Sequence, residues 1–264
     1  MKNMKKFISF SGGVESTAMC LLYGKGAKAI WCDTGAEHAL MYERVDYCEK
    51  VLTAHHGGDF ELIRIKPSVT CKGEKVQTLT QYIERSMYMP SKMRRYCTGR
   101  FKIEPIDLFL AEQGECELMI GFNADETARV GNFEKAKNVL YRYPLQDAGY
   151  TREDCEFMLT DYDLHPNLPP YMKRGGCKYC IFKSIKEYKA MYFFNRAEFM
   201  ECLNLERSVQ DKRGKFFAIS MSGRSLQDIA KECETELQMF SADAMQNMYA
   251  KVQAAQACGA FCHR

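Results

Sequence analysis

The sequence predicts an α/β fold in which a parallel, twisted sheet of about five strands has helices on both faces and is followed by a helical C-terminal appendage. Short apolar runs alternate with segments whose apolar residues recur at helical spacing. This alternation is typical of right-handed βαβ units, which build parallel sheets that are buried on both faces. Beyond residue 185 the strand signals stop while helical periodicity continues, and this change predicts the appendage.

The expected strands are short and mostly apolar, as buried strands of a parallel sheet should be. The first leads directly into a Gly-Gly turn, and the last is an edge strand ahead of Pro144. Their residue ranges are 6–10, 29–32, 60–65, 118–122 and 140–143.

The expected helices follow the strands and then dominate the end of the chain. The most distinct one begins at Thr151, a capping residue followed by acidic residues in the first turn. The polar stretch over 67–92 has little strand signal and is interpreted as a lid or a substrate-facing insertion. The other helices are expected after the Gly-Gly turn and over 41–51, 78–85, 103–112, 186–206 and 225–257, with a polar break at 210–214.

These elements divide the chain into an α/β domain, residues 1–184, and a helical C-terminal region, residues 185–264. The second region is expected to pack as an appendage or to form the surface of a homodimer. A chain of 264 residues is long enough for this arrangement, and 46% hydrophobic with 27% charged residues is an ordinary globular mixture.

Charge and cysteine content narrow the classes of function and compartment. The net charge of +3 gives no polyanion-binding signal for the whole molecule, so any nucleic-acid surface must be local. No stretch has the roughly 18 apolar residues of a membrane span, and no secretory signal is recognisable. The 13 cysteines are scattered and odd in number, so most should be thiols or ligands, and a cytoplasmic location is expected.

A candidate phosphate-binding loop, SGGVES at 11–16, lies between the first strand and the first helix. Backbone N–H groups at such a helix end hold anions, and the glycines let the backbone approach closely. The hydroxyls of Ser11, Ser16 and Thr17 would donate to the same phosphates. The loop is not a Walker loop, because no Gly-Lys-Ser/Thr follows. The alternative is a tight turn with a serine cap.

A second candidate site is the pair Cys177 and Cys180, which follows Gly175-Gly176. A turn of this composition lets two thiolates converge on one metal atom. A redox pair and simple structural thiols are the alternatives.

Six motifs occur in one order across about two thirds of the chain: SFSGGVEST (9–17), WCDTGAEH (31–38), RRYCTGRFKIEPI (94–106), GFNADETAR (121–129), YPLQD (143–147) and LPPYMKRGGCKYC (168–180). In these motifs the chain resembles the PP-loop ATP pyrophosphatases, or adenine nucleotide α-hydrolase-like superfamily, and within it the phosphoadenosine phosphosulfate (PAPS) reductase-like family. The resemblance implies a HUP/Rossmann-like sheet, with ATP and Mg²⁺ as ligands.

The resemblance also implies roles for individual residues. The phosphates would be bound by Ser9, Ser11, Gly12, Gly13 and Ser16, and Arg129 would add a phosphate contact. The adenosine would be bordered by Asp33, Thr34, Gly35 and Gly121. Asp33 also lies at the carboxyl end of a strand, where open α/β sheets bind ligands, and a helix cap is its alternative role. Glu15 stands where the family usually has Asp.

Cys97 belongs to a motif that resembles the first cluster motif of the reductase branch. Cluster-containing members have two adjacent cysteines there, whereas this chain has Tyr96 in place of the first. The metal ligands that match are Cys97, Cys177 and Cys180. A [4Fe-4S] cluster on three cysteines leaves one iron open, a pattern similar to iron–sulfur tRNA thiolation enzymes. A fourth ligand such as Cys71 or Cys116, or a Zn²⁺ site instead of the cluster, are alternatives.

Basic residues flank both cysteine segments. Arg94, Arg95, Arg100 and Lys102 surround Cys97, while Lys173, Arg174, Lys178 and Lys183 surround the other two cysteines. If the segments meet, their cations form a site for phosphate or sulfate groups. Arg94, Arg95, Lys102 and Arg129 are the candidates for substrate contacts, with solvated surface charge as the alternative.

The first functional hypothesis is an ATP pyrophosphatase that adenylylates a substrate for sulfur transfer, with a tRNA base, DNA or a small metabolite as acceptor and a sulfur donor protein as partner. The second is an adenylylsulfate or phosphoadenylylsulfate (APS/PAPS) reductase, served by an electron donor protein. The third is a nucleotide-binding cluster sensor without activity. No catalytic residue is assigned.

Two departures from the pattern weigh against the reductase. The SGGxxS loop is intact here, whereas reductases tend to have a degraded one. The Cys-Gly-x-His tail of the reductases is interrupted in this chain, because Cys258-Gly259 is followed by Ala260, Phe261 and Cys262 before the histidine.

Overall fold

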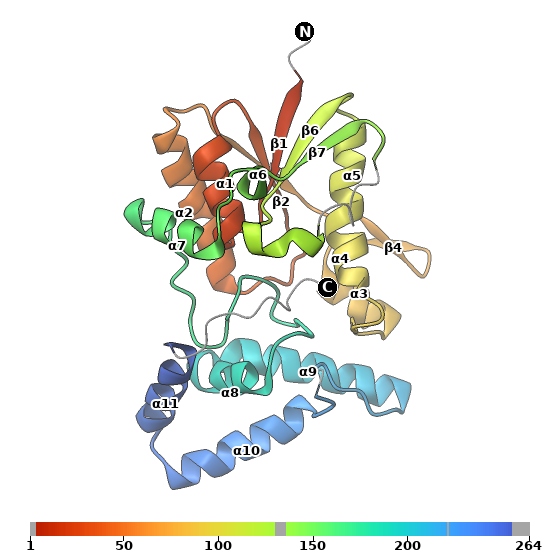
Figure 1. Ribbon diagram of the computed structural model, residues 1–264. Helices are drawn as coiled ribbons and strands as arrows, with labels where there is room; N and C mark the ends of the chain where they lie inside the picture. The colour runs from red at the N-terminus through yellow and green to blue at the C-terminus, as the bar shows by residue number, and fades with distance from the viewer. Residues whose placement is uncertain (1–3, 130–135, 221, 255–264) are drawn as a thin grey trace.

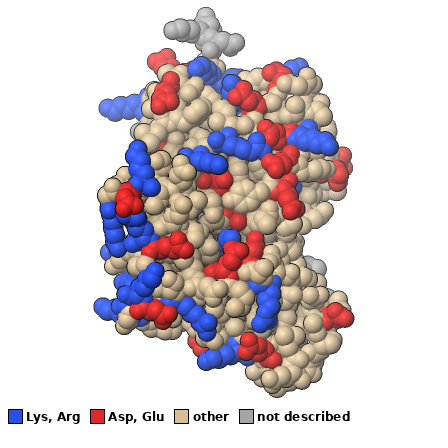
Figure 2. Space-filling view, turned by 180° about the vertical axis from the view of Figure 1, so that it is seen from behind, with Lys and Arg blue, Asp and Glu red and all other residues tan. Residues whose placement is uncertain are grey.

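The computed structural model describes residues 4–129, 136–220 and 222–254. The sheet and its covering helices form one part of the molecule, and helices α8–α11 lie together beyond the carboxyl ends of the strands (Figure 1). Charged side chains of both signs are spread over the face seen in Figure 2, and Lys and Arg gather along one of its edges.

The sheet confirms the predicted fold class. It has five strands, all parallel, in the order β3-β2-β1-β6-β7. Central β1 pairs with β2 on one side and with β6 on the other. The strand order therefore reverses between β1 and β6, and open α/β sheets bind ligands at the carboxyl ends of such a pair. The strands are β1 (Lys5–Ser9), β2 (Lys28–Cys32), β3 (Glu61–Ile65), β6 (Cys116–Ile120) and β7 (Val139–Arg142).

Helices cover both faces of the sheet, because consecutive residues of its central strands point to opposite faces and are buried on both. Ile8 and Trp31 belong to an apolar cluster shared with helices α1 (Val14–Tyr23), α2 (Ala39–His55) and α7 (Arg152–Asp161). The preceding residue of β1, Phe7, points to the opposite face and packs with residues of α5 (Glu104–Ala111). Both faces of β1 are thus buried, as is typical of a central parallel strand.

The stretch over 67–92 contains a small hairpin that the sequence analysis missed. Strands β4 (Val69–Cys71) and β5 (Glu74–Val76) pair antiparallel and are followed by α3 (Leu79–Ser86). The turn residues Lys72 and Gly73 have φ values of +48° and +85°, as tight hairpin turns require. Strands of three residues are too short to produce a period-2 signal in the sequence.

The predicted long C-terminal helices are each divided in two. Asn195 ends α8 (Ile185–Phe194), and its side chain accepts a hydrogen bond from the Glu198 N–H, which starts α9 (Arg196–Arg213). The predicted polar break at 210–214 was placed too early, since α9 continues to Arg213. Ser241 separates α10 (Leu226–Met239) from α11 (Ala242–Ala254) in the same way, because its hydroxyl accepts from the Ala244 N–H.

One apolar cluster joins the C-terminal helices to the rest of the molecule. Leu79 and Ile83 of α3 and Phe101 share it with Tyr188 of α8 and Phe199 of α9, and all five side chains are buried. No described helix combines the length and the apolar character that a membrane crossing requires. The short elements are α4 (Tyr96–Thr98), a π-helical turn η1 (Gly99–Ile103), a 3-10 helix η2 (Ala124–Arg129) and α6 (Pro144–Asp147).

Candidate functional site

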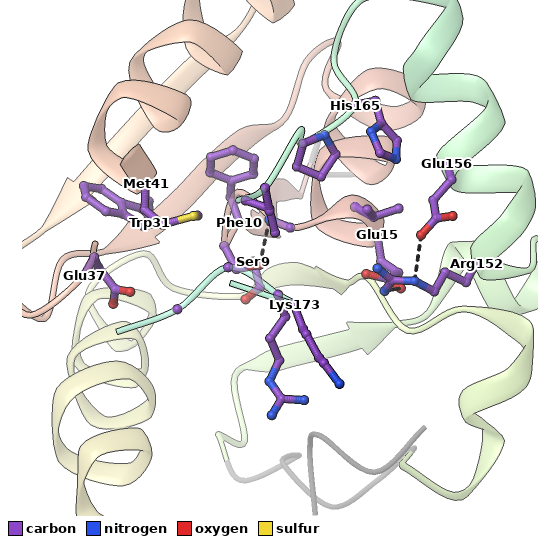
Figure 3. Close-up of a pocket in the computed structure, with 18 of the residues that line it drawn as sticks. Ser9, Phe10, Glu15, Trp31, Glu37, Met41, Arg152, Glu156, His165 and Lys173 are labelled. Carbon is purple, nitrogen blue, oxygen red and sulfur yellow. Dashed lines mark hydrogen bonds and ion pairs between the residues drawn. The ribbon is translucent and has the colours of Figure 1, made fainter. Parts of the chain in front are cut away.

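A cavity of about 1100 Å³ opens at the carboxyl ends of β1 and β2. Its floor is formed by Ser9, Phe10 and the SGGVES loop, and Trp31 closes one side (Figure 3). The first turns of α7 and the segments 165–168 and 173–176 form the opposite walls. The candidate phosphate loop therefore faces a space large enough for a nucleotide-sized ligand.

The loop needs its first glycine. Gly12 has φ +75°, in the left-handed region, and a Cβ there would lie 3.0 Å from the Met41 Cε. The Ser11 and Ser16 hydroxyl oxygens are 3.0 Å apart, and the Thr17 hydroxyl donates to the Gly13 carbonyl at 2.7 Å. The hydroxyls that the sequence assigns to phosphate binding are thus engaged within the loop and hold its shape.

The first turn of α1 leaves its amino end open toward the cavity. Gly13 is the residue before the helix, and no side chain caps it. The first N–H groups of a helix lack partners within the helix, and the helix dipole adds positive potential at this end. This end of α1 therefore suits an anion.

Arg44 of α2 supports the loop by a hydrogen bond to its backbone, a role that the sequence analysis missed. Its Nε donates to the Gly12 carbonyl at 2.6 Å, and its Nη2 donates to the Leu164 carbonyl at 2.9 Å. Burial lowers the pKa of Arg44. An arginine in the middle of α2 has no sequence signal that connects it to a loop 32 residues earlier.

Glu15 is held by two partners instead of pointing freely into the cavity. Its Oε1 accepts from the Arg152 Nη1 at 2.7 Å and from the Asn123 Nδ2 at 3.2 Å. Arg152 also pairs with Glu156, and Figure 3 shows its side chain between the two carboxylates. The Asn123 Oδ1 accepts from the Asp125 N–H at 3.0 Å, which brings a further carboxylate to this wall.

Gly121 is required for packing. A Cβ at this position would lie 3.1 Å from the carbonyl carbon and oxygen of Glu15. The end of β6 can therefore approach the first turn of α1 only because it carries no side chain there. Gly121 does not line the cavity.

The residues after β2 shape the turn that borders the cavity, and none of the three predicted ones lines it. The Asp33 Oδ1 accepts from the Gly35 N–H and from the Tyr42 hydroxyl, both at 2.8 Å. Gly35 has φ +66°, and a Cβ there would lie 2.4 Å from the Thr78 Cγ2. The Thr34 hydroxyl donates to Glu37, which does line the cavity. The helix-cap alternative for Asp33 is wrong, because His38 precedes α2.

Only some of the predicted cations reach the cavity. Lys102 lines it and lies 3.5 Å from the Glu37 Oε1, which is the main reason that the pKa of Lys102 is raised. Lys173 and Arg174 line it as well. Arg94 and Arg95 do not, and the Arg95 guanidinium lies over the Phe182 ring at 5.1 Å. The side chain of Arg129 lies outside the described residues, as do Cys258 and Cys262.

The two cysteine segments meet next to the cavity. Cys177 pairs with Glu37 in an isolated β-bridge, and the Lys178 N–H donates to the Ala36 carbonyl at 2.9 Å. The Cys177 thiol hydrogen-bonds to Cys180, and Cys97 is an electrostatic neighbour of Cys180. Lys102 neighbours both Cys97 and Cys177, so one cation connects the thiols to the cavity.

The described residues contain no group of three Cys, His, Asp or Glu side chains that is already arranged to hold a metal ion. The two proposed fourth ligands differ in position. Cys71 lies in the apolar cluster that Cys97 and Cys177 contact. Cys116 lies opposite Lys5 at the amino end of β6, at the far edge of the sheet from the loop.

The surroundings of the three thiols shift their pKa values in different directions. The hydrogen bond from Cys177, with smaller contributions from the Phe182 N–H, Lys183 and Arg174, lowers the pKa of Cys180 to about 6. The same hydrogen bond and burial raise the pKa of Cys177, and burial raises the pKa of Cys97. At neutral pH the pair therefore consists of a Cys180 thiolate and a Cys177 thiol donor.

In metal-free, reduced protein, Cys180 is expected to be alkylated by iodoacetamide with a rate that is half-maximal near pH 6, since the thiolate is lost as pH falls through about 6. Cys177→Ala removes the donor and should raise this midpoint, slowing alkylation at pH 7 about tenfold. Peptide mass spectrometry measures the rates. Cys97, whose pKa is raised, is the internal control and should react only at higher pH. Equal profiles for Cys180 and Cys97 would contradict the assignment.

A buried polar cluster connects α2 to the C-terminal helices. The His38 Nδ1 lies 2.5 Å from the Glu198 Oε2, and its Nε2 lies 3.2 Å from the Lys183 Nζ. The Glu198 Oε1 accepts from the Ala39 N–H at 2.8 Å and so completes the amino end of α2. Burial is the main reason that the pKa of His38 is lowered, which favours a neutral ring that donates to Glu198.

Other cavity residues carried no decisive signal in the sequence. The helix cap at Thr151 was predicted, and the structure confirms it. The sequence did not predict that the first turn of α7 lines the same cavity as the loop. His165 also lines the cavity (Figure 3). No family model matches the chain, and no curated protein matches its sequence.

Proposed function

We propose that the chain is an ATP-dependent PP-loop enzyme, an ATP pyrophosphatase that adenylylates a substrate for sulfur transfer. The observation that carries this proposal is the uncapped amino end of α1, which follows a left-handed Gly12 and faces a cavity at the carboxyl ends of β1 and β2. An anion-binding helix end at this position of an open α/β sheet suits a nucleotide.

The residues present fit ATP and Mg²⁺. The loop backbone and the end of α1 would hold the β- and γ-phosphates, while Lys102, Lys173 and Arg174 line the same cavity and would neutralise charge. Asp125 is a carboxylate on the adjoining wall and would hold Mg²⁺. The metal, when bound, would supply further neutralisation of the phosphate oxygens.

The reaction follows from this placement. An oxygen of the acceptor attacks the α-phosphorus, the bond from that phosphorus to the β-phosphate bridging oxygen breaks, and pyrophosphate leaves. Sulfide from a donor protein then forms a bond to the adenylylated carbon and displaces AMP. The protein contributes mainly positioning and charge stabilisation.

The thiols supply the sulfur side of the proposal. Cys97, Cys177 and Cys180 come from two segments that meet beside Lys102, and three thiolates are a donor set that suits a [4Fe-4S] cluster or Zn²⁺. A cluster, when bound, would supply an iron that carries the sulfur atom. Free thiols persist in a reducing compartment, so this donor set suits a cytoplasmic enzyme.

One observation favours a second candidate, the APS/PAPS reductase. Cys180 is a thiolate near Lys183 and Arg174. Such a thiolate would attack the sulfate sulfur and expel the nucleotide. Attack by Cys177 would then release sulfite and leave a disulfide, which an electron donor protein reduces.

Product analysis tests the proposals. Purified protein is incubated with Mg-ATP, a sulfide source and pools of cellular RNA, DNA or small metabolites, and separately with APS or PAPS and a dithiol. Pyrophosphate and AMP from ATP are the expected products. Sulfite from the sulfonucleotides would favour the reductase. If neither set of products forms, the remaining hypothesis is the nucleotide-binding cluster sensor without activity. Release of orthophosphate would contradict attack at the α-phosphorus.

A further inference from the structure

Basic and aromatic side chains gather on the side of the molecule next to the thiols. Segments 85–102 and 207–215 contain ten Lys or Arg residues and a single carboxylate, Asp211, although the net charge of the whole chain is only +3. Lys and Arg side chains gather along the left edge of Figure 2, over the part of the molecule that contains the β4–β5 hairpin, α3 and the end of α9.

Guanidinium groups lie close to tyrosine rings on this surface. The Arg213 Cζ lies 4.3 Å from the centre of the exposed Tyr88 ring, and the Arg94 Cζ lies 5.9 Å from the same centre. The Arg100 Cζ lies 5.8 Å from the Tyr82 ring centre, and its Nη1 donates to the Tyr82 hydroxyl at 3.0 Å. We call Tyr82, Tyr88, Arg94, Arg100 and Arg213 the basic–aromatic surface.

These arginines keep their charge available. Within the described chain, Arg94, Arg100 and Arg213 form no ion pair with a carboxylate, unlike Arg85, which pairs with Glu74. Arg94 and Arg100 are exposed. Unpaired guanidinium groups beside the exposed Tyr88 ring and the half-buried Tyr82 ring present phosphate donors and aromatic faces together.

The surface continues into the candidate site. The Tyr96 ring lies 4.9 Å from the Tyr82 ring, and its hydroxyl donates to the Tyr88 carbonyl. Cys97 follows directly and is half-buried, and Lys102, further along the same segment, lines the cavity. A ligand on the basic–aromatic surface would therefore lie next to the thiols.

We propose that the basic–aromatic surface binds an unpaired stretch of nucleic acid, whose phosphates pair with the arginines and whose bases stack on Tyr88 and Tyr82. Stacking platforms combined with a cationic track are how proteins hold single strands without reading sequence. An acidic protein would use the charges but not the stacked rings. The inference rests on the proposed function only where it makes this strand the sulfur acceptor.

Binding is measured by fluorescence anisotropy without ATP, with labelled oligouridylate and oligothymidylate of about 20 nucleotides and a duplex of equal length. Both single strands should bind, and more tightly than the duplex. Arg94→Gln with Arg213→Gln should weaken binding at least about tenfold. The double substitution should also reduce the slope of log affinity against log salt by about 1.4, because each lost phosphate contact on a single strand removes about 0.7.

Tyr88→Leu separates stacking from charge, because affinity should fall about tenfold while the salt slope stays unchanged. The matched control is Arg196→Gln. Arg196 also lies over a tyrosine, with its Cζ 4.1 Å from the Tyr192 ring centre, but at the other end of α9. The Arg196→Gln variant should bind the single strands as tightly as the unsubstituted protein does. Thermal unfolding checks that every variant is folded.

Three results would overturn the inference: no binding of either single strand, equal loss in the Arg196 variant, or equally tight binding of polyglutamate with the same dependence on the variants, which would indicate an acidic protein partner. Because the measurement contains no ATP, its failure leaves pyrophosphate release untouched. Loss of pyrophosphate release with intact strand binding would instead contradict the proposed function alone.

Discussion

Gly12→Ala is expected to lower the affinity for ATP by more than about 100-fold, because a displaced loop loses at least two charge-assisted hydrogen bonds of about 1.5 to 3 kcal/mol each. The added Cβ would meet the Met41 Cε at 3.0 Å, and alanine tolerates the left-handed φ of +75° poorly. The backbone strain alone costs about 1 to 2 kcal/mol of folding free energy. Calorimetric titration with Mg-ATP measures the affinity.

Gly26→Ala is the matched control for this prediction. Gly26 has φ +73° in the turn before β2, and its Cβ would meet nothing within 4 Å. Both variants should therefore be destabilised by a similar strain energy, while only the Gly12 variant loses ATP. Equal ATP affinity in the two variants would show that the nucleotide does not use the loop.

Cys97→Ala and Cys177→Ala are each expected to remove most of the metal that copurifies with the protein under anaerobic conditions. A site with three protein ligands that loses one retains too few to hold a cluster or a zinc ion firmly. Iron, zinc and acid-labile sulfide assays, with the visible spectrum, measure the loss and decide between the [4Fe-4S] cluster and Zn²⁺.

The control for the metal prediction is Cys116→Ala. Cys116 is a buried thiol at the amino end of β6, remote from the loop, so its removal should leave the metal content unchanged. If the Cys97 and Cys177 variants keep their metal, the ligand assignment is wrong. If only the Cys116 variant loses it, the metal belongs to another site.

The fold was predictable because its signals are local. Each strand of the sheet is an apolar run with its own boundaries, and Thr151 announces its helix with a cap and acidic residues. The hairpin at Lys72-Gly73 was missed because its strands of three residues are too short to show a period. The breaks at Asn195 and Ser241 were missed because a single polar residue inside a periodic apolar pattern gives no signal of its own.

The candidate site was predictable only in part because its supporting contacts are distant in sequence. The SGGVES loop and the thiol segments stand out by composition. The partners of Glu15, by contrast, lie more than 100 residues away, and Arg44 supports the loop from another helix. Asp33, Thr34 and Gly35 illustrate the reverse case, since their motif predicts a ligand contact while their side chains and backbone organise a turn.

The Glu198 carboxylate accepts a hydrogen bond from the Ala39 N–H at the start of α2, so the last third of the chain helps to support the candidate site. Helix α2 also supplies Met41, which lies against Gly12, and Arg44, which donates a hydrogen bond to the Gly12 carbonyl. A shift of α9 would therefore reach the phosphate loop through one rigid helix. The shape of the candidate phosphate loop therefore depends in part on Arg44 and Glu198, which do not line the cavity.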